Sequence, residues 1–297
     1  MDKNKTNYVI YHGNCCDGFA SAYSIWKYFK LNNENHLKNI IFYPAKYNTC
    51  PPNVHNKNVV ICDFSYNEKL LLNMIEQADS LVILDHHKSA ENELKNIPSF
   101  TEKINKIFRM DQSGAVITWN YFFPNTPVPK FIKYIEDRDI WKKEMKYSDE
   151  FNMGFHTIPM KFEEYDKYID EKNINILIEK GKILLEYNNS LIKQICKHAI
   201  VKSSLIDKKF YKIAYVQSNI LKSDIGNYLV KKVFPGCDFS VVYNYDDLYK
   251  YTKFSLRSTN DKTDVSIIAK LFNGGGHRNA SGITINGNLC YLPSKII

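Results

Sequence analysis

Histidine and aspartate side chains follow three short apolar segments of this chain. His12 follows the segment Asn7–Tyr11, Asp63 follows Val59–Cys62, and Asp85, His86 and His87 follow Leu81–Leu84. Imidazole and carboxylate groups are ligands suited to Mn²⁺, Mg²⁺ and Zn²⁺. Two such cations about 3.5–4 Å apart, joined by a shared carboxylate, lower the pKa of a bridging water and stabilise both oxygens of an in-line displacement at phosphorus. The residue types therefore point to metal-assisted hydrolysis of a phosphate ester.

The apolar segments alternate with stretches of helical pattern. A further apolar run covers Ile40–Tyr43, and helices are predicted over Phe19–Phe29 and Glu68–Gln77. Such alternation is typical of a parallel sheet covered by helices on both faces. Ligands of these sheets bind at the carboxyl ends of the strands. We therefore expect a doubly wound α/β domain in which the histidines and aspartates meet at one sheet edge.

Other carboxylates extend the set of candidate metal ligands. Asp17 lies just after the first predicted strand, and the segment Glu136–Asp139 contains Asp137 and Asp139. A helix that ends in this segment can direct either of those two side chains inward, so both are candidates. Taken singly, an aspartate at a strand end is often only a helix N-cap.

These motifs resemble those of the DHH phosphoesterase superfamily. The matching residues, in the order of the family, are His12-x4-Asp17-Gly18, Asp63, Asp85-His86-His87 and Glu136-Asp137-Arg138-Asp139. The segment Gly274-Gly275-Gly276-His277-Arg278-Asn279-Ala280-Ser281-Gly282 resembles the GGGH signature of its C-terminal DHHA1 domain. The motifs cover nearly the whole chain. The resemblance is to the RecJ-like and nanoRNase branch, which hydrolyses phosphodiesters in short oligonucleotides, dinucleotides or single strands.

The resemblance implies two divalent metal ions, for which we expect Mn²⁺, and a role for each motif residue. His12 and Asp63 would bind one ion. The other ion would be bound by Asp17, Asp63, His86 and the aspartate of the fourth motif, with Asp63 bridging. His87 would stabilise charge on the scissile phosphate, while Asp85 would orient the imidazoles.

Cys15 departs from the family pattern, because many members have an aspartate two residues before the position of Asp17. A thiolate at Cys15 could bind a metal, and it would shift the preference away from Mg²⁺. Alternatively Cys15 takes no part, and the first metal is held more weakly. The sequence leaves both interpretations open.

The C-terminal part predicts a second, smaller α+β domain. Strands are expected over Lys212–Val216, Phe239–Tyr243 and Tyr251–Leu256, with a helix near Ser223–Val233. The predicted organisation is a DHH catalytic domain over residues 1–160, a helical linker over 161–204 and a DHHA1 substrate-binding domain over 205–297.

The substrate-binding candidates lie in that second domain. Backbone N–H groups of Gly274, Gly275 and Gly276 can form a nest for an anion, and His277 can add a donor. Only four of the 40 basic residues are arginines, and Arg offers bidentate contacts to phosphate. Arg257 is the candidate phosphate clamp, and Arg278 directly follows the histidine. Trp141 and Phe155 could stack on a base, but aromatic residues are abundant in this chain and mostly belong to the core, so neither is counted as a site candidate.

Length and composition exclude fibrous, collagenous, membrane-spanning and disordered proteins. The chain has 297 residues, a net charge of +8 and seven cysteines, an odd number that argues against a full disulfide framework. No apolar run approaches the ~20 residues of a membrane span, and the first residues lack the apolar core of a signal peptide. We expect a soluble, intracellular and cytoplasmic protein without a membrane partner, and the sequence is compatible with a homodimer.

The function expected from these observations is a hydrolase that cleaves phosphodiester bonds in short oligonucleotides or dinucleotides through two-metal activation of water. One alternative is a phosphatase or pyrophosphatase that acts on a small phosphorylated compound. Another is a catalytically silent binding protein with the same fold. The sequence does not distinguish RNA, DNA and cyclic dinucleotides as substrates, nor does it give the direction of attack.

Overall fold

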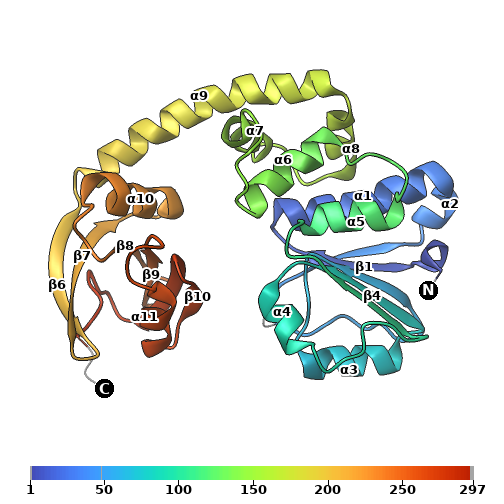
Figure 1. Cartoon of the computed structure of the whole chain (residues 1–297), viewed down its shortest axis with the longest axis horizontal. Coiled ribbons are helices and arrows are strands. Elements are labelled where there is room, and N and C mark those ends of the chain that lie inside the picture. Colours follow the sequence, from blue (N-terminus) through green and yellow to red (C-terminus); the bar gives the residue numbers. More distant parts are fainter. Residues whose placement is uncertain (1, 48, 295–297) are drawn as a thin grey trace. The chain divides into compact units, whose positions relative to one another are not determined.

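The computed structural model describes residues 2–47 and 49–294 of the chain. It divides into two compact units, of which the first ends at Leu185 and the second begins at Glu186 (Figure 1). The long helix α9 (Glu171–Cys196) contains the boundary between them.

The first unit contains a five-stranded parallel sheet in the order β2-β1-β3-β4-β5. Its strands are β1 (Tyr8–His12), β2 (Ile41–Ala45), β3 (Asn58–Cys62), β4 (Ser80–Asp85) and β5 (Ile104–Phe108). The chain runs outward from β1 to β2 and then returns to β3 on the other side of β1. The strand order therefore reverses between β1 and β3, which is where doubly wound sheets bind their ligands.

Helices cover both faces of this sheet. Figure 1 shows α1 (Cys16–Asn32) and α5 (Gly114–Phe122) on one face and α3 (Glu68–Gln77) on the other. Successive strand residues point to opposite faces, so Val82 packs in the core with α1 and α5 while Ile83 packs in the core with α3. The other helical elements of this unit are the 3₁₀ turns η1 (Lys3–Lys5) and η2 (Lys167–Ile169) and helices α2 (Glu34–Leu37), α4 (Lys88–Glu93), α6 (Lys130–Asp139), α7 (Ser148–Phe155) and α8 (Phe162–Asp166).

The predicted fold class is confirmed, and the first four strands lie within two residues of their predicted bounds. Helix α3 has its predicted bounds. Strand β5 was not predicted, because Asn105 and Lys106 interrupt its apolar pattern. The predicted linker of residues 161–204 contains α8, η2 and α9, and Tyr165 and Tyr168 from its beginning pack in the core of the first unit.

The second unit contains a six-stranded mixed sheet in the order β10-β11-β9-β8-β7-β6. Its strands are β6 (Ile200–Ile206), β7 (Lys209–Gln217), β8 (Phe239–Asp246), β9 (Tyr251–Arg257), β10 (Gly275–His277) and β11 (Ala280–Asn286). Helix α11 (Val265–Leu271) packs in one core, and α10 (Lys222–Tyr228) packs in another with the π-turn η3 (Leu229–Val233) and the end of α9. This is the predicted smaller α+β fold.

No helix among the residues that the structure describes is both long and apolar enough to cross a bilayer.

Candidate active site

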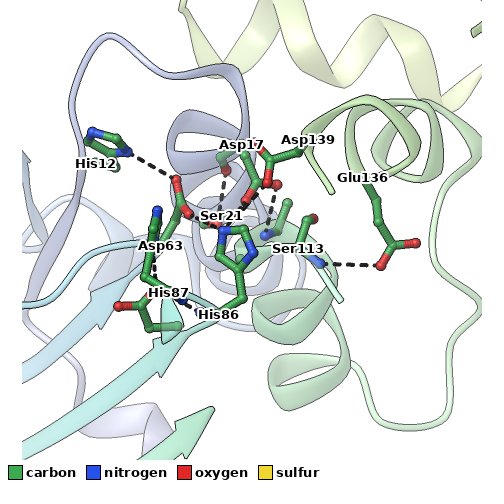
Figure 2. Close-up of polar contacts among 12 residues, drawn as sticks. His12, Asp17, Ser21, Asp63, His86, His87, Ser113, Glu136 and Asp139 are labelled. Carbon is green, nitrogen blue, oxygen red and sulfur yellow. Dashed lines mark hydrogen bonds and ion pairs between the residues drawn. The ribbon is translucent and has the colours of Figure 1, made fainter. Parts of the chain in front are cut away.

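The predicted strand-end residues meet at the carboxyl edge of the first sheet, where its strand order reverses. His12 is the last residue of β1, Asp63 follows β3, and His86 follows β4. Figure 2 shows Asp63 between the imidazoles of His12 and His86. The distances to its carboxylate are 3.5 Å from His12 Nδ1 and 3.0 Å from His86 Nε2.

Asp63 itself is buried and has a strained backbone. Its φ angle of 52° lies in the left-handed region, which is unfavourable for a residue with a side chain. Such strain persists only where surrounding contacts enforce it, and it is concentrated at functional sites. The conformation directs the carboxylate back over the sheet edge, toward both histidines.

Asp17 and Asp139 approach the same imidazole from two different helices. Asp17, in the first turn of α1, has Oδ2 3.9 Å from His86 Nε2, and Asp139, the last residue of α6, has Oδ2 3.5 Å from the same nitrogen. The other oxygen of Asp17 accepts a hydrogen bond from the N–H of Ala115 at the start of α5. The cluster thus combines side chains from strand ends and from helices.

The three carboxylates repel one another in the absence of a cation. Burial raises the pKa of Asp17, and the charges of Asp63 and Asp139 raise it further. Burial and then Asp63 raise the pKa of Asp139 to about 6. Burial alone would raise the pKa of Asp63 too, but its interactions with His12 and His86 outweigh burial and lower it. Without a cation, burial and mutual repulsion therefore disfavour the simultaneous ionisation of Asp17, Asp63 and Asp139.

The donor set fits divalent metal ions. Ligand atoms lie within 4.8 Å of one another in the trio His12, Cys15 and Asp63, and again in the trio Asp17, His86 and Asp139. Oδ2 of Asp17 and Oδ2 of Asp63 are buried, yet they accept no hydrogen bond from the residues that the structure describes. Buried oxygens of this kind are costly unless a partner satisfies them. A cation in each trio would provide that partner.

His87 forms a separate pair with Asp85. Nδ1 of His87 lies 2.7 Å from Oδ1 of Asp85, which also accepts the backbone N–H groups of His86 and His87. The other oxygen of Asp85 accepts a hydrogen bond from the hydroxyl of Ser65 at 2.6 Å. Burial would lower the pKa of His87, but the hydrogen bond and charge of Asp85 raise it to about 9. His87 therefore carries a proton at neutral pH in the metal-free protein.

The structure separates the two aspartates of the fourth motif. Asp137 is turned away from the cluster, and its Oδ1 accepts the backbone N–H groups of Glu144 and Met145 at 2.8 and 3.2 Å. Two residues correspond to about 200° of rotation around a helix, so Asp137 and Asp139 project from opposite sides of α6. These contacts favour Asp139 over Asp137 as the metal ligand, because Oδ1 of Asp137 holds a loop while Asp139 faces His86.

Cys15 lies beside the cluster, at the N-cap of α1. Burial raises the pKa of its thiol, and the charge of Asp63 raises it further. The thiol is therefore neutral without a metal. A bound cation reverses this balance, because a thiol that coordinates a metal is deprotonated.

Three contributors to the site were not identified from the sequence. Tyr47 has its ring 5.2 Å from that of His12, Ser65 supports Asp85, and Gly114 packs against Asp63. Each lies in a loop or at a helix start without a distinctive motif, so only the folded structure reveals it.

The substrate-binding candidates of the second unit lie at one end of its sheet. Arg257 of β9 pairs with Ala280 of β11, and Ala280 pairs with His277 of β10, so the three residues form one row across three strands. The guanidinium of Arg257 donates to the Ser223 hydroxyl at 2.7 Å and to the Leu256 carbonyl at 2.8 Å. Burial lowers its pKa.

The glycine segment leaves no space for a side chain at two positions, and a Cβ at Gly274 would overlap the carbonyl oxygen of Gly282. Gly276 has a φ angle of 135°, and a Cβ there would lie 2.5 Å from the carbonyl oxygen of Ala280. Gly274 donates its N–H to the Ala269 carbonyl, whereas Gly275 and His277 are exposed. Arg278 donates to the carbonyls of Asn260 and Lys262 and lies 3.5 Å from Asp264. These contacts tie Arg278 to its own loop.

Comparisons with other proteins agree with this architecture. No protein-family model matches the chain. The uncharacterized protein R106 of Acanthamoeba polyphaga mimivirus is 39% identical over 303 residues, which cover 99% of this chain and 70% of R106.

Solved structures share the fold at low sequence identity. The DHH domain of PF0399, described as a member of the s1p family of ribosomal proteins, has a TM-score of 0.61 at 11% identity, with 96% of this chain and 84% of that chain covered. The pGpG-specific phosphodiesterase PggH of Vibrio cholerae has a TM-score of 0.53 at 13% identity over 95% and 94% of the two chains. An exopolyphosphatase-related protein of Bacteroides fragilis has a TM-score of 0.51 at 14% identity over 96% and 88%. The chain therefore belongs to one protein family with mimivirus R106, and its architecture is the DHH/DHHA1 phosphoesterase fold.

Proposed function

We propose that this protein is a metal-dependent phosphodiesterase that hydrolyses phosphodiester bonds in short oligonucleotides or dinucleotides. The observation that carries the proposal is the position of Asp63 between His12 and His86, with Asp17 and Asp139 beside it, at the reversal point of the sheet. Phosphoesterase chemistry is also supported by the fold shared with PggH, which is described as a pGpG-specific phosphodiesterase.

The ligand trios suggest a site for two divalent cations. His12, Asp63 and Cys15 would hold one, and Asp17, His86 and Asp139 would hold the other, with Asp63 shared between them. We expect Mn²⁺, since the oxygen-rich donor set with two imidazoles suits it. When bound, the cations would activate a water and offset charge on the phosphate oxygens.

His87 would act on the substrate directly. Because Asp85 keeps its imidazole protonated, His87 can donate a hydrogen bond to a non-bridging phosphate oxygen as negative charge accumulates there. Asp85 is a positioning residue, since its oxygens are occupied by His87, by two backbone N–H groups and by Ser65.

The second unit would recognise a terminal phosphate or a second phosphate of the substrate. Arg257 and His277 lie in one row at the end of the sheet, next to the exposed Gly275. Their side chains offer several hydrogen-bond donors there. We assign this role first to Arg257 and His277, because they share one row of the sheet, whereas Arg278 lies in the turn between β10 and β11.

A substrate panel with Mn²⁺ tests the proposal. It contains linear dinucleotides, a five-mer, a long single strand, cyclic dinucleotides and pyrophosphate. Asp63→Asn and His87→Ala are compared with Asp79→Asn and His156→Ala, which change exposed residues of the same types outside the cluster. We expect mononucleotides to be released from the short substrates, with activity lost only in the first two variants.

The other outcomes of this panel contradict the proposal in different ways. Release of phosphate from pyrophosphate alone would indicate a pyrophosphatase. Binding of Mn²⁺ without turnover of any substrate would indicate a silent binding protein.

A further inference from the structure

Glu136 joins two helices that supply candidate metal ligands or their support. It lies in α6, and its Oε1 accepts the backbone N–H of Ser113 at 3.3 Å (Figure 2). Asp139 follows three residues later in the same helix, so the two side chains project from neighbouring positions on its surface. Helix α6 thus directs one carboxylate to the start of α5 and the other toward His86.

The contact completes the N-terminal cap of α5. Ser113 is the N-cap residue, and its hydroxyl accepts the N–H of Val116, the third residue of the helix, at 3.4 Å. In a capping box, a Glu or Gln at that third position also accepts the N–H of the N-cap residue. Val116 has no such group, and the first turn of α5 contains no acidic residue. Glu136 supplies the missing acceptor from a different helix.

The same cap holds Asp17. Oδ1 of Asp17 accepts the N–H of Ala115 at 3.2 Å. Burial raises the pKa of Asp17, and hydrogen bonds from the Ser113 side chain and the Ala115 N–H oppose that rise. Asp17 and Asp139 lie 3.9 and 3.5 Å from the same nitrogen of His86. A shift of the α5 cap relative to α6 would therefore change the distance between the two carboxylates.

We propose that Glu136 is a positioning residue of the metal site, which sets the spacing between Asp17 and Asp139 by completing the cap of α5 from α6. The inference rests on the proposed function. Glu136 belongs to none of the ligand groups among the residues that the structure describes. Its other oxygen, Oε2, lies 3.5 Å from Nζ of Lys142. Both of its oxygens are therefore occupied away from the candidate cations.

Two conservative variants separate the reach of this side chain from its charge. Glu136→Asp keeps the charge but withdraws the acceptor from Ser113, and we expect calorimetric titration to show Mn²⁺ affinity about 10-fold lower. Glu136→Gln keeps an oxygen within reach and loses the partly exposed pair with Lys142, which contributes little. It should keep most of the affinity. Glu144→Asp is the control, because Glu144 is exposed and its side chain has no ion pair within the described ranges.

A double-mutant cycle tests whether Glu136 acts through Asp139. In a chain that carries Asp139→Ala, the spacing no longer matters, so Glu136→Asp should weaken Mn²⁺ binding much less than it does in the natural chain. A merely structural role would lower the affinity by the same factor in both chains. Urea unfolding with EDTA verifies that each variant is folded before titration.

The inference is overturned if Glu136→Gln loses as much affinity as Glu136→Asp, or more. It is also overturned if neither variant loses affinity, or if Asp139→Ala leaves the effect of Glu136→Asp undiminished.

The outcomes separate this inference from the proposed function. If Glu136→Asp binds Mn²⁺ as tightly as the natural chain and the short substrates are hydrolysed, the positioning role is wrong while the phosphodiesterase stands. If the cycle shows the coupling but no substrate is hydrolysed, the phosphodiesterase is wrong while the positioning role stands. A natural chain that binds no Mn²⁺ would overturn both.

Discussion

Gly114 lies directly against Asp63. A Cβ atom added at Gly114 would lie 2.5 Å from Cβ of Asp63 and 3.0 Å from Oδ2 of Asp17. The first residue of α5 therefore leaves no space between the helix and two of the candidate metal ligands. This contact also places the N–H of Ala115 where Asp17 accepts it. The start of α5 positions the cluster although it supplies no ligand.

Gly114→Ala is expected to damage the site without changing a titratable group. The added methyl group must displace Asp63 or α5, and we expect Mn²⁺ affinity and activity to fall about 10- to 100-fold, as for other changes to residues that position metal ligands. Calorimetric titration of Mn²⁺ and turnover of a dinucleotide measure these effects. Gly236→Ala is the matched control, because a Cβ at Gly236 meets no atom within 4 Å. Unchanged Mn²⁺ affinity in Gly114→Ala would contradict this packing.

Substitutions in the fourth motif should separate metal binding from stability. We expect Asp139→Ala to weaken Mn²⁺ binding about 10- to 100-fold. The free energy of unfolding of the metal-free protein should stay equal or rise, because a carboxylate that repels Asp63 and Asp17 is removed. Asp137→Ala should instead lower that free energy by about 1–3 kcal/mol, since two backbone N–H groups lose their acceptor.

Urea unfolding with EDTA and calorimetric titration with Mn²⁺ distinguish the two aspartates. The reverse pattern, with metal binding lost in Asp137→Ala and stability lost in Asp139→Ala, would mean that α6 presents its other face to the cluster.

Cys15 should give the metal site a thiolate signature. We expect the Co²⁺-loaded protein to show a near-ultraviolet sulfur-to-cobalt charge-transfer band, because Cys15 Sγ lies with His12 and Asp63 in one ligand trio. Cys15→Ser should lose the band, and Cys15→Asp should bind Mg²⁺ more tightly than the natural chain does. Cys16→Ser is the control, since Cys16 belongs to none of the ligand groups. A cobalt complex without the band would leave Cys15 outside the metal shell.

The sequence predicted the strand-end residues because two simple signals coincide there. Continuous apolar runs mark the buried parallel strands, and the first polar residue after each run must lie at the carboxyl edge. His12, Asp63 and His86 meet there for that reason. The sequence was less informative at β5, which is an edge strand with only partial burial and therefore has no continuous apolar run.

The orientation of α6 and the exposure of Trp141 were not predictable from residue types. Asp137 and Asp139 are chemically identical, and only the rotation of α6 about its own axis decides which one faces His86. Trp141 has a left-handed backbone and an exposed indole, and no glycine or proline in the segment Glu136–Tyr147 indicates that turn. Tertiary packing sets both features.

The ion pair between His87 and Asp85 gives a pH dependence that can be measured in the metal-free protein. We expect NMR titration to find His87 with a pKa of about 9, against an ordinary value of 6.5. Asp85→Asn should move the pKa of His87 back toward 6.5, whereas Ser65→Ala, which removes only the partner of the other oxygen of Asp85, should move it much less.

Because the folded protein holds the His87 proton more tightly than the unfolded chain, the stabilisation is fully present below about pH 6.5 and is lost as the pH rises through about 9. The difference in unfolding free energy between the natural chain and Asp85→Asn should therefore shrink over that interval. In the metal-loaded enzyme, Asp85→Asn should reduce turnover about 10- to 100-fold at neutral pH. A wild-type His87 that titrates near 6.5 would remove the basis for its role as a proton-bearing donor to the phosphate.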